Sequence, residues 1–333
     1  MDKMKFSQVI PRIRVYETKL LDKSKIDIMI DSNSASEALK VLQETEYGKF
    51  MNNVNKDLDY EIILSEELKR LFNVMYDISP VKSLVDLMSI KYDYHNIKVI
   101  LKGMFLKEDL SYLLIPVGTM EVSELKSFIE NMHLSDLAPI MREAIAEVMS
   151  SFENTKDPQI IDIILDKYMF KAIIQIKNEI KDAFIDKYVV ALIDSTNLKT
   201  LLRVKKQNKG RNFFASVIIE GGSIDKDKLL GMLNDDAQNI ATKLSFSNYA
   251  EFIKNGIEYY TKTNSVSLLE KLVDNYIMDR MKNAKIIPFG VEPLLAYIYA
   301  KETEIKIIRI IMVGKLNNIS SEIVRERLRD SYV

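Results

Sequence analysis

Apolar residues recur along this chain at alternating steps of three and four positions, with little of the strict alternation typical of strands. One segment shows the pattern clearly, because Leu87, Ile90, Tyr94, Ile97 and Leu101 follow one another at steps of three, four, three and four. This spacing places one apolar stripe along the face of an α-helix. The sequence therefore predicts an all-α protein.

Glycine and proline are scarce, with 10 and 7 in 333 residues, so those present are expected to mark helix ends. Three long helices are predicted. The first runs from about Pro80 to Gly103, the second from about Ala183 to Gly210, and the third from Pro293 to Gly314. Proline suits the first turn of a helix, and glycine takes the left-handed conformation that closes one.

These three segments contain an internal repeat of about a hundred residues. Residues 96–102 (NIKVILK) match residues 197–203 (NLKTLLR), and residues 304–310 (EIKIIRI) give a third copy, each with one lysine at the equivalent place. Three further sets of segments agree with this register: 118–120 with 222–224 and 314–316, 164–168 with 272–276, and 42–50 with 244–252.

Three copies of one helical unit are therefore expected, over residues 1–115, 116–219 and 220–333. Such units either stack as a solenoid or close around an axis. Closure into a pseudo-three-fold funnel leaves no repeated end exposed, although periodicity alone permits both arrangements.

Composition narrows the possible functions. The 47 basic and 48 acidic residues nearly cancel, so no general positive field favours nucleic acid. Because the chain has no cysteine, disulfides, thiolate-bound metals and a cysteine nucleophile are excluded. The charged start of the chain does not resemble a signal peptide. No apolar run approaches the length of about 18 residues that a membrane span requires.

Candidate catalytic groups are few. His95 and His133 are the two histidines, and a metal-dependent hydrolase built on them is one hypothesis, but neither has a second histidine at ligand spacing. Gly221 and Gly222 resemble a phosphate loop, although the following lysine is wrongly spaced and an inter-helix turn explains them better. We therefore expect no catalytic residue, no cofactor, no metal and no small-molecule substrate.

Charged clusters also have simple explanations. The acidic pairs 66–67 and 235–236 are interpreted as solvated helix faces or first-turn charges, with no mark of burial. The basic segment 203–212, followed by Phe213 and Phe214, could bind phosphates and stacked bases. A helix C-terminus also attracts lysine and arginine, and we favour that interpretation.

Several segments resemble the C subunit of the V/A-type (vacuolar/archaeal-type) ATP synthases, the counterpart of the d subunit of the eukaryotic V-ATPase. They are the residues 12–21, 44–48, 91–98 (KYDYHNIK), 289–297 (FGVEPLLAY), 301–306 (KETEIK) and 313–317. The segments lie near both ends and in the middle of the chain, so the resemblance covers nearly all of it.

The resemblance implies a non-catalytic central-stalk subunit, a funnel that joins the axle of the ATP-hydrolysing or ATP-synthesising head to the membrane rotor ring, for proton or sodium transport. The protein would lie peripherally at the cytoplasmic face, with membrane contact only through the ring. The alternative is a helical-repeat adaptor that binds other proteins outside any rotary motor.

Six cations on the three predicted long helices are the candidate partner interface: Lys98, Lys102, Lys199, Arg203, Lys306 and Arg309. In a funnel implied by the resemblance, matched positions would surround the opening where the axle docks. The alternative is that these residues lie on solvated helix faces.

Overall fold

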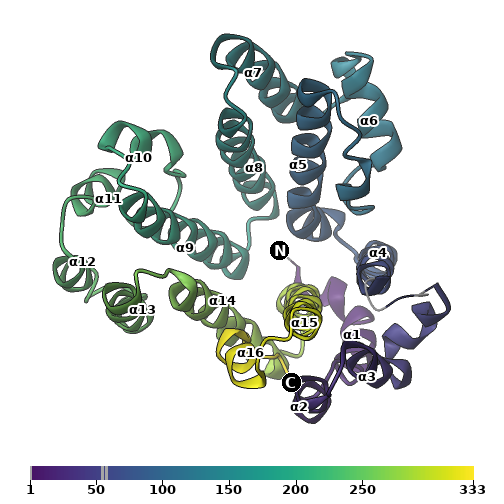
Figure 1. Ribbon diagram of the computed structural model, residues 1–333. Helices are drawn as coiled ribbons and strands as arrows, with labels where there is room; N and C mark the ends of the chain where they lie inside the picture. Colours follow the sequence, from purple (N-terminus) through teal and green to yellow (C-terminus); the bar gives the residue numbers. More distant parts are fainter. Residues whose placement is uncertain (1, 54–55, 57–58) are drawn as a thin grey trace. The chain divides into compact units, whose positions relative to one another are not determined.

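The chain is helical throughout the part that the computed structural model describes, which is residues 2–53, 56 and 59–333 (Figure 1). Within these ranges the helices are joined by turns and loops, and no strand occurs. The prediction of an all-α protein is confirmed. The chain divides into two compact units.

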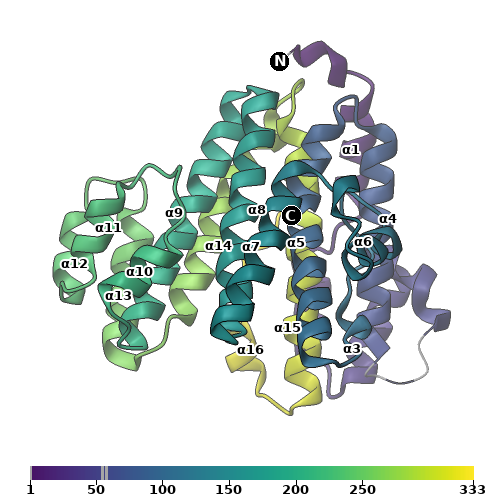
Figure 2. The same ribbon diagram turned by 90° about the horizontal axis from the view of Figure 1, so that it is seen from above.

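The first unit comprises Val81–Thr200 and Lys209–Leu230. Its longest helices, α5 and α8, lie side by side in both ribbon views (Figures 1 and 2) and pack against each other, while α7 packs on α8 and α6 on α5. Its elements are α5 (Lys82–Leu106), η5 (Ser111–Leu113), α6 (Val122–Glu130), η6 (Leu134–Asp136), α7 (Pro139–Thr155), α8 (Gln159–Ile180), α9 (Ala183–Lys206) up to Thr200, α10 (Arg211–Val217) and the start of α11 (Lys226–Met232).

The second unit comprises Asp2–Pro80, Leu201–Asn208 and Gly231–Val333, so both ends of the chain belong to it. Here α15 contacts α1, α2, α3, α4, α14 and α16. The elements are η1 (Lys3–Phe6), α1 (Val9–Glu17), α2 (Lys23–Asp31), α3 (Ala35–Val41), η2 (Leu42–Glu44), η3 (Glu46–Asn53), α4 (Tyr60–Ile78), α12 (Ala237–Lys243), α13 (Ala250–Thr263), α14 (Ser267–Lys282), η7 (Asn283–Ile286), α15 (Glu292–Leu316) and α16 (Ser321–Arg327).

The α15 helix forms the centre of the second unit. Seventeen of its 25 residues are buried, and they include the charged Lys301 and Glu304. A helix that is apolar nearly all round needs neighbours on every side, which explains its many contacts. Despite this apolar character, none of the described helices is long and apolar enough to cross a membrane.

The long helices begin near the predicted residues but end elsewhere. The predicted ends at Gly103, Gly210 and Gly314 are wrong, because α5 continues to Leu106, α9 stops at Lys206 and α15 continues to Leu316. Lys107, with φ of 55°, closes α5 in the left-handed conformation. Gly103 instead allows close approach, since a Cβ there would lie 3.0 Å from the Glu108 carbonyl oxygen.

Gly314 also serves close packing. A Cβ at this position would lie 2.6 Å from a methyl group of Val324 on α16. Residues 314–316 therefore lie inside α15, and their match to the loop segments 118–120 and 222–224 is wrong. The other two segments do follow their helices.

Candidate functional site

The six candidate cations lie on α5, α9 and α15, two on each helix. In each helix the second cation follows the first by one turn: Lys102 follows Lys98, Arg203 follows Lys199, and Arg309 follows Lys306. Residues three or four positions apart lie on one face of a helix. Each helix thus presents a short cationic stripe at the equivalent place of the repeat.

The second cation of each stripe forms an ion pair with an acidic residue of another helix. Lys102 Nζ lies 2.8 Å from Asp162 Oδ1, and Arg203 Nη2 lies 2.6 Å from Glu270 Oε1. Arg309 contacts both carboxylate oxygens of Glu61, at 2.7 and 2.9 Å. All these side chains are partly exposed.

The acidic partners are themselves equivalent positions of the repeat. Asp162 lies 101 residues after Glu61, and Glu270 lies 108 residues after Asp162. Each occupies the first turn of its helix, α4, α8 or α14, where a carboxylate is favoured by the helix dipole. The three pairs are therefore one interaction made three times. They join α5 to α8, α9 to α14, and α15 to α4.

The first cations of the stripes are less uniform. Lys98 Nζ lies 2.6 Å from Asp166 Oδ1, on the helix that also supplies Asp162. Lys306 pairs with Asp274, the equivalent of Asp166. Asp274 lies on α14, which precedes the helix of Lys306, whereas Asp166 lies on α8, which follows the helix of Lys98. Lys199 occupies the matching position on α9. Lys98 and Lys306 are therefore engaged within the chain.

Sequence reasoning missed a set of buried polar side chains on the same helices. The carboxylate of Asp93 accepts the Thr119 amide at 2.9 Å, and that of Asp194 accepts the Ser223 amide at 2.9 Å. One turn later, Asn96 and Asn197 exchange two hydrogen bonds each with the backbones of Ile115 and Ile219. The signal was an Asp-x-x-Asn motif at matching positions of the first two long helices, 101 residues apart.

Burial and hydrogen bonding act in opposite directions on Asp93. Burial raises the pKa of this carboxyl to about 6, and the hydrogen bonds from Thr119 and Met120 lower it less than burial raises it. Thr119 contributes both its amide and its hydroxyl. Titration of the Asp93 carboxyl therefore changes the charge at the contact between α5 and the loop that contains Thr119.

The histidines lie apart from any metal-binding cluster. His95 Nε2 is 3.0 Å from the carbonyl oxygen of Leu113, and His133 is exposed before η6. Within the described residues, no group of three or more histidine and acidic side chains could hold a metal ion. The hydrolase hypothesis has no observation that favours it.

The charged clusters have structural partners. Asp236 caps α12 by accepting the Asn239 amide at 2.7 Å, which fits the interpretation as a first-turn charge. Lys205, in the last turn of α9, donates to the carbonyl oxygens of Leu233 and Asp235. The expectation that Glu67 is solvated is wrong, because its side chain is fully buried.

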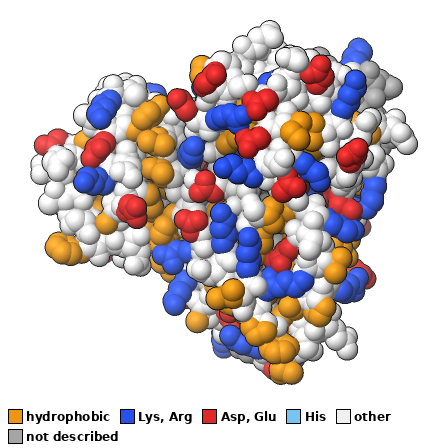
Figure 3. Space-filling view, turned by 90° about the horizontal axis from the view of Figure 1, so that it is seen from below, with side chains coloured by type: hydrophobic (Ala, Val, Ile, Leu, Met, Phe, Trp, Pro, Cys, Tyr) orange, Lys and Arg blue, Asp and Glu red, His pale blue; other side chains and the backbone are white. Residues whose placement is uncertain are grey.

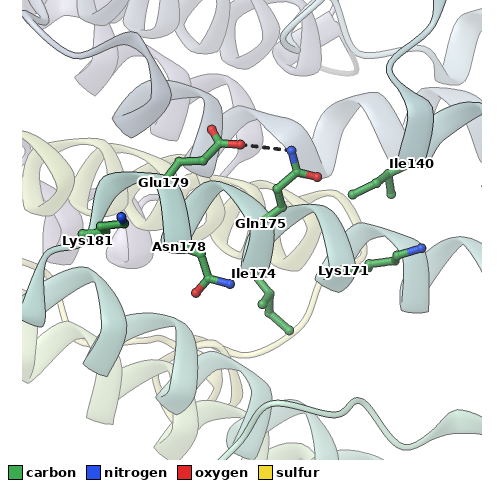
Figure 4. Close-up of a pocket in the computed structure, with 7 residues that line it drawn as sticks. All are labelled: Ile140, Lys171, Ile174, Gln175, Asn178, Glu179 and Lys181. Atoms are coloured by element: carbon green, nitrogen blue, oxygen red, sulfur yellow. Dashed lines mark hydrogen bonds between the residues drawn. The ribbon is translucent and has the colours of Figure 1, made fainter.

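The surface of the first unit carries a shallow groove of about 650 Å³ (Figure 4). Its lining comes from α8, from Lys181 directly after that helix, and from Ile140 at the start of α7. The Gln175 amide donates to Glu179 at 3.0 Å, one helical turn away, so these two polar groups satisfy each other.

On the face shown in Figure 3, cationic and anionic side chains are interspersed.

Comparison with known proteins gives consistent matches over the whole chain. The family model described as ATP synthase (C/AC39) subunit matches residues 9–327. The C subunit of the V-type sodium ATPase of Enterococcus hirae is 30% identical, covering 99% of both chains. The C subunit of the A-type ATP synthase of Methanocaldococcus jannaschii is 28% identical, covering 97% of this chain and 86% of its own.

Proposed function

Because the chain belongs to the ATP synthase (C/AC39) subunit family, we propose that it is the central-stalk subunit that couples the axle of a rotary ATPase to the membrane rotor ring. In this proposal it has no catalytic site and transmits torque as a rigid body. Close-packed protein interiors have low compressibility, so a load on one face is delivered at another. The subunit lies peripherally on the cytoplasmic face, held through the ring.

The threefold ion pair is the observation that carries the mechanical part of the proposal. With the three copies that we propose, residues 1–115, 116–219 and 220–333, the pairs would join the first copy to the second, the second to the third, and the third to the first. The last of these, between Arg309 and Glu61, is what a closed arrangement requires and a stacked solenoid does not. A pseudo-three-fold funnel is thus the arrangement that we propose.

The first test is a pull-down with the axle subunits and with the ring subunit, each purified separately. The proposal expects the chain to bind both. Binding to neither would contradict it and favour an adaptor outside the rotary motor.

The second test asks whether the cationic stripes contact the axle. Reversal of Lys98, Lys199 and Lys306 to glutamate is expected to weaken axle binding and to reduce its dependence on salt. Unchanged affinity and unchanged salt dependence would exclude these lysines from the interface.

A matched control separates direct contact from damage to the packing of the copies. Lys102→Asp combined with Asp162→Lys exchanges the charges of one ion pair and preserves the bond between helices. If Lys102→Asp alone weakens axle binding and the exchange restores it, Lys102 acts by holding α5 to α8. If the exchange does not restore binding, Lys102 contacts the axle itself.

A further inference from the structure

A cluster of buried charges lies in the second unit between α4, α15 and η3. Lys301 Nζ is 3.0 Å from Glu67 Oε1 and 2.6 Å from Glu304 Oε1. Glu304 also accepts the hydroxyl of Tyr47 at 2.7 Å and the backbone amide of Leu21. The side chains of Tyr47, Glu67 and Lys301 are at most 1% exposed, and Glu304 is 5% exposed.

The charges of this cluster are balanced. Arg70 forms two hydrogen bonds of 2.7 Å with Glu67, so two cations face two carboxylates. Burial by itself lowers the pKa of Lys301, but Glu304 and Glu67 raise it above its usual value. Burial likewise raises the pKa of Glu67, but Arg70 and Lys301 lower it below its usual value. Lys301 and Glu67 are therefore held in their charged forms.

Comparison of the three copies shows which residues of the first two copies are replaced by the buried charges in the third. Glu304 is the third-copy equivalent of Asn96 and Asn197, and Lys301 is the equivalent of Asp93 and Asp194. Each of the three positions 96, 197 and 304 accepts one backbone amide, from Ile115, Ile219 and Leu21 respectively. The start of the chain thus occupies, on the last long helix, the place that the following loop occupies on the first two.

The three contacts differ in how the chain tethers them. The bonded residues are 19 and 22 positions apart in the first two copies, and 283 apart in the third. Closing a longer loop costs more conformational entropy. In the third contact, α15 must bind one particular segment that is far away in the sequence. A set of matched charges takes the place of the neutral asparagine at this contact.

Buried ion pairs add little net stability compared with apolar packing, but their geometry specifies which groups meet. Charges at such a seam regain water when it opens, whereas apolar side chains lose by exposure, so the seam is where we expect the second unit to open first. We propose that Tyr47, Glu67, Lys301 and Glu304 form an ionic latch that fastens the start of the chain to α15, and that this latch opens while the first unit stays folded.

The absence of cysteine from the sequence allows a direct test by thiol labelling. Leu21→Cys reports the latch, and Ile219→Cys is the matched control, because both residues are buried and donate the backbone amide to the equivalent helix position. In the full-length protein under native conditions, the thiol at position 21 is expected to react with N-ethylmaleimide roughly tenfold faster than the thiol at position 219.

Removing the central charge should affect only the latch. Adding Lys301→Met is expected to increase labelling at position 21 by roughly a further tenfold and to leave labelling at position 219 within about twofold. Tyr47→Phe, which removes one hydroxyl and keeps the packing, is expected to produce a smaller increase at position 21 alone.

Equal labelling rates at the two positions in the parent protein would overturn the proposal. If Lys301→Met unfolds the whole chain, both positions become reactive, and Tyr47→Phe then decides: a rise at position 21 alone supports the latch, and equal or no change contradicts it. The measurement uses the isolated chain, so it is independent of whether the chain binds an axle or a ring.

Discussion

At the scale of single residues, glycine is required at two positions because each lies directly against a carboxylate. A Cβ at Gly118 would lie 2.0 Å from Asp93 Oδ1, and one at Gly222 would lie 2.2 Å from Asp194 Oδ1. A contact this short forces the loop away from the helix and disrupts the hydrogen bonds to Thr119 and Ser223. The glycines therefore allow the Asp-x-x-Asn contacts to form.

We expect Gly222→Ala to destabilise the protein by about 1–3 kcal/mol, as measured by urea denaturation, because added volume here displaces backbone. Gly231→Ala is the matched control, since a Cβ there has no atom within 4 Å and helical alanine is favoured over glycine by about 0.5–1 kcal/mol. Equal effects of the two substitutions would contradict this account.

Asp93 gives a prediction for pH dependence. Its pKa rises from 3.8 for an unperturbed carboxyl to about 6 in the folded protein, so the folded state holds the proton more tightly than the unfolded state. The contribution of the Asp93 carboxyl to the free energy of unfolding is complete below about pH 4 and is lost as the pH rises through about 6. Comparison with Asp93→Asn should show a loss of up to about 3 kcal/mol over this range. A stability difference that stays constant from pH 4 to 7 would contradict the shift.

At the scale of helices, the repeated ion pairs fasten the end of one long helix to the start of another. Each joins a cation four or five turns into α5, α9 or α15 to the first turn of α8, α14 or α4. The side chains are partly exposed, so water and salt weaken the attraction. Apolar packing between the helices supplies most of the stability, and the pairs set the register.

A double-mutant cycle at Arg309 and Glu61 measures this contribution. Alanine at both positions is expected to reveal a coupling free energy of about 0.2–1 kcal/mol, since exposed pairs are weak even when two hydrogen bonds form. The cycle at Lys102 and Asp162 should give a similar value. No coupling at either pair, measured by denaturant unfolding at low salt, would show that the pairs do not connect the helices.

At the scale of the whole molecule, the two units differ in how far apart their contacts lie in the sequence. In the first unit, Lys98 and Asp166 are separated by 68 residues, whereas in the second Arg309 and Glu61 are separated by 248. Contacts between distant residues form later because the intervening chain must first be ordered. The second unit also needs both ends of the chain.

We therefore expect the two units to fold in order. In pulsed hydrogen exchange during refolding, amides of α5 and α8 should become protected before those of α4 and α15. Simultaneous protection of all four helices would mean that the units fold as one.

The sequence by itself determined the all-α class, the starts of the long helices and the family, because helical periodicity and short motifs are local properties of the chain. It also placed Lys98, Lys199 and Lys306 at matched helix positions, with Lys102, Arg203 and Arg309 about one turn further along each helix. The repeat shift even relates Glu61, Asp162 and Glu270, although their pairing with the cations gave no local signal.

Only the tertiary structure decided which of these charges meet and which are buried. Glu67 and Lys301 have the surroundings of ordinary surface residues in the sequence, yet they are buried against each other across 234 positions. Helix ends also depended on tertiary contacts, since Gly103 and Gly314 make room for neighbours and do not end helices. The physical reason is that periodicity reports which face of a helix is apolar, whereas the environment of a charge depends on residues that lie far along the chain and close in space.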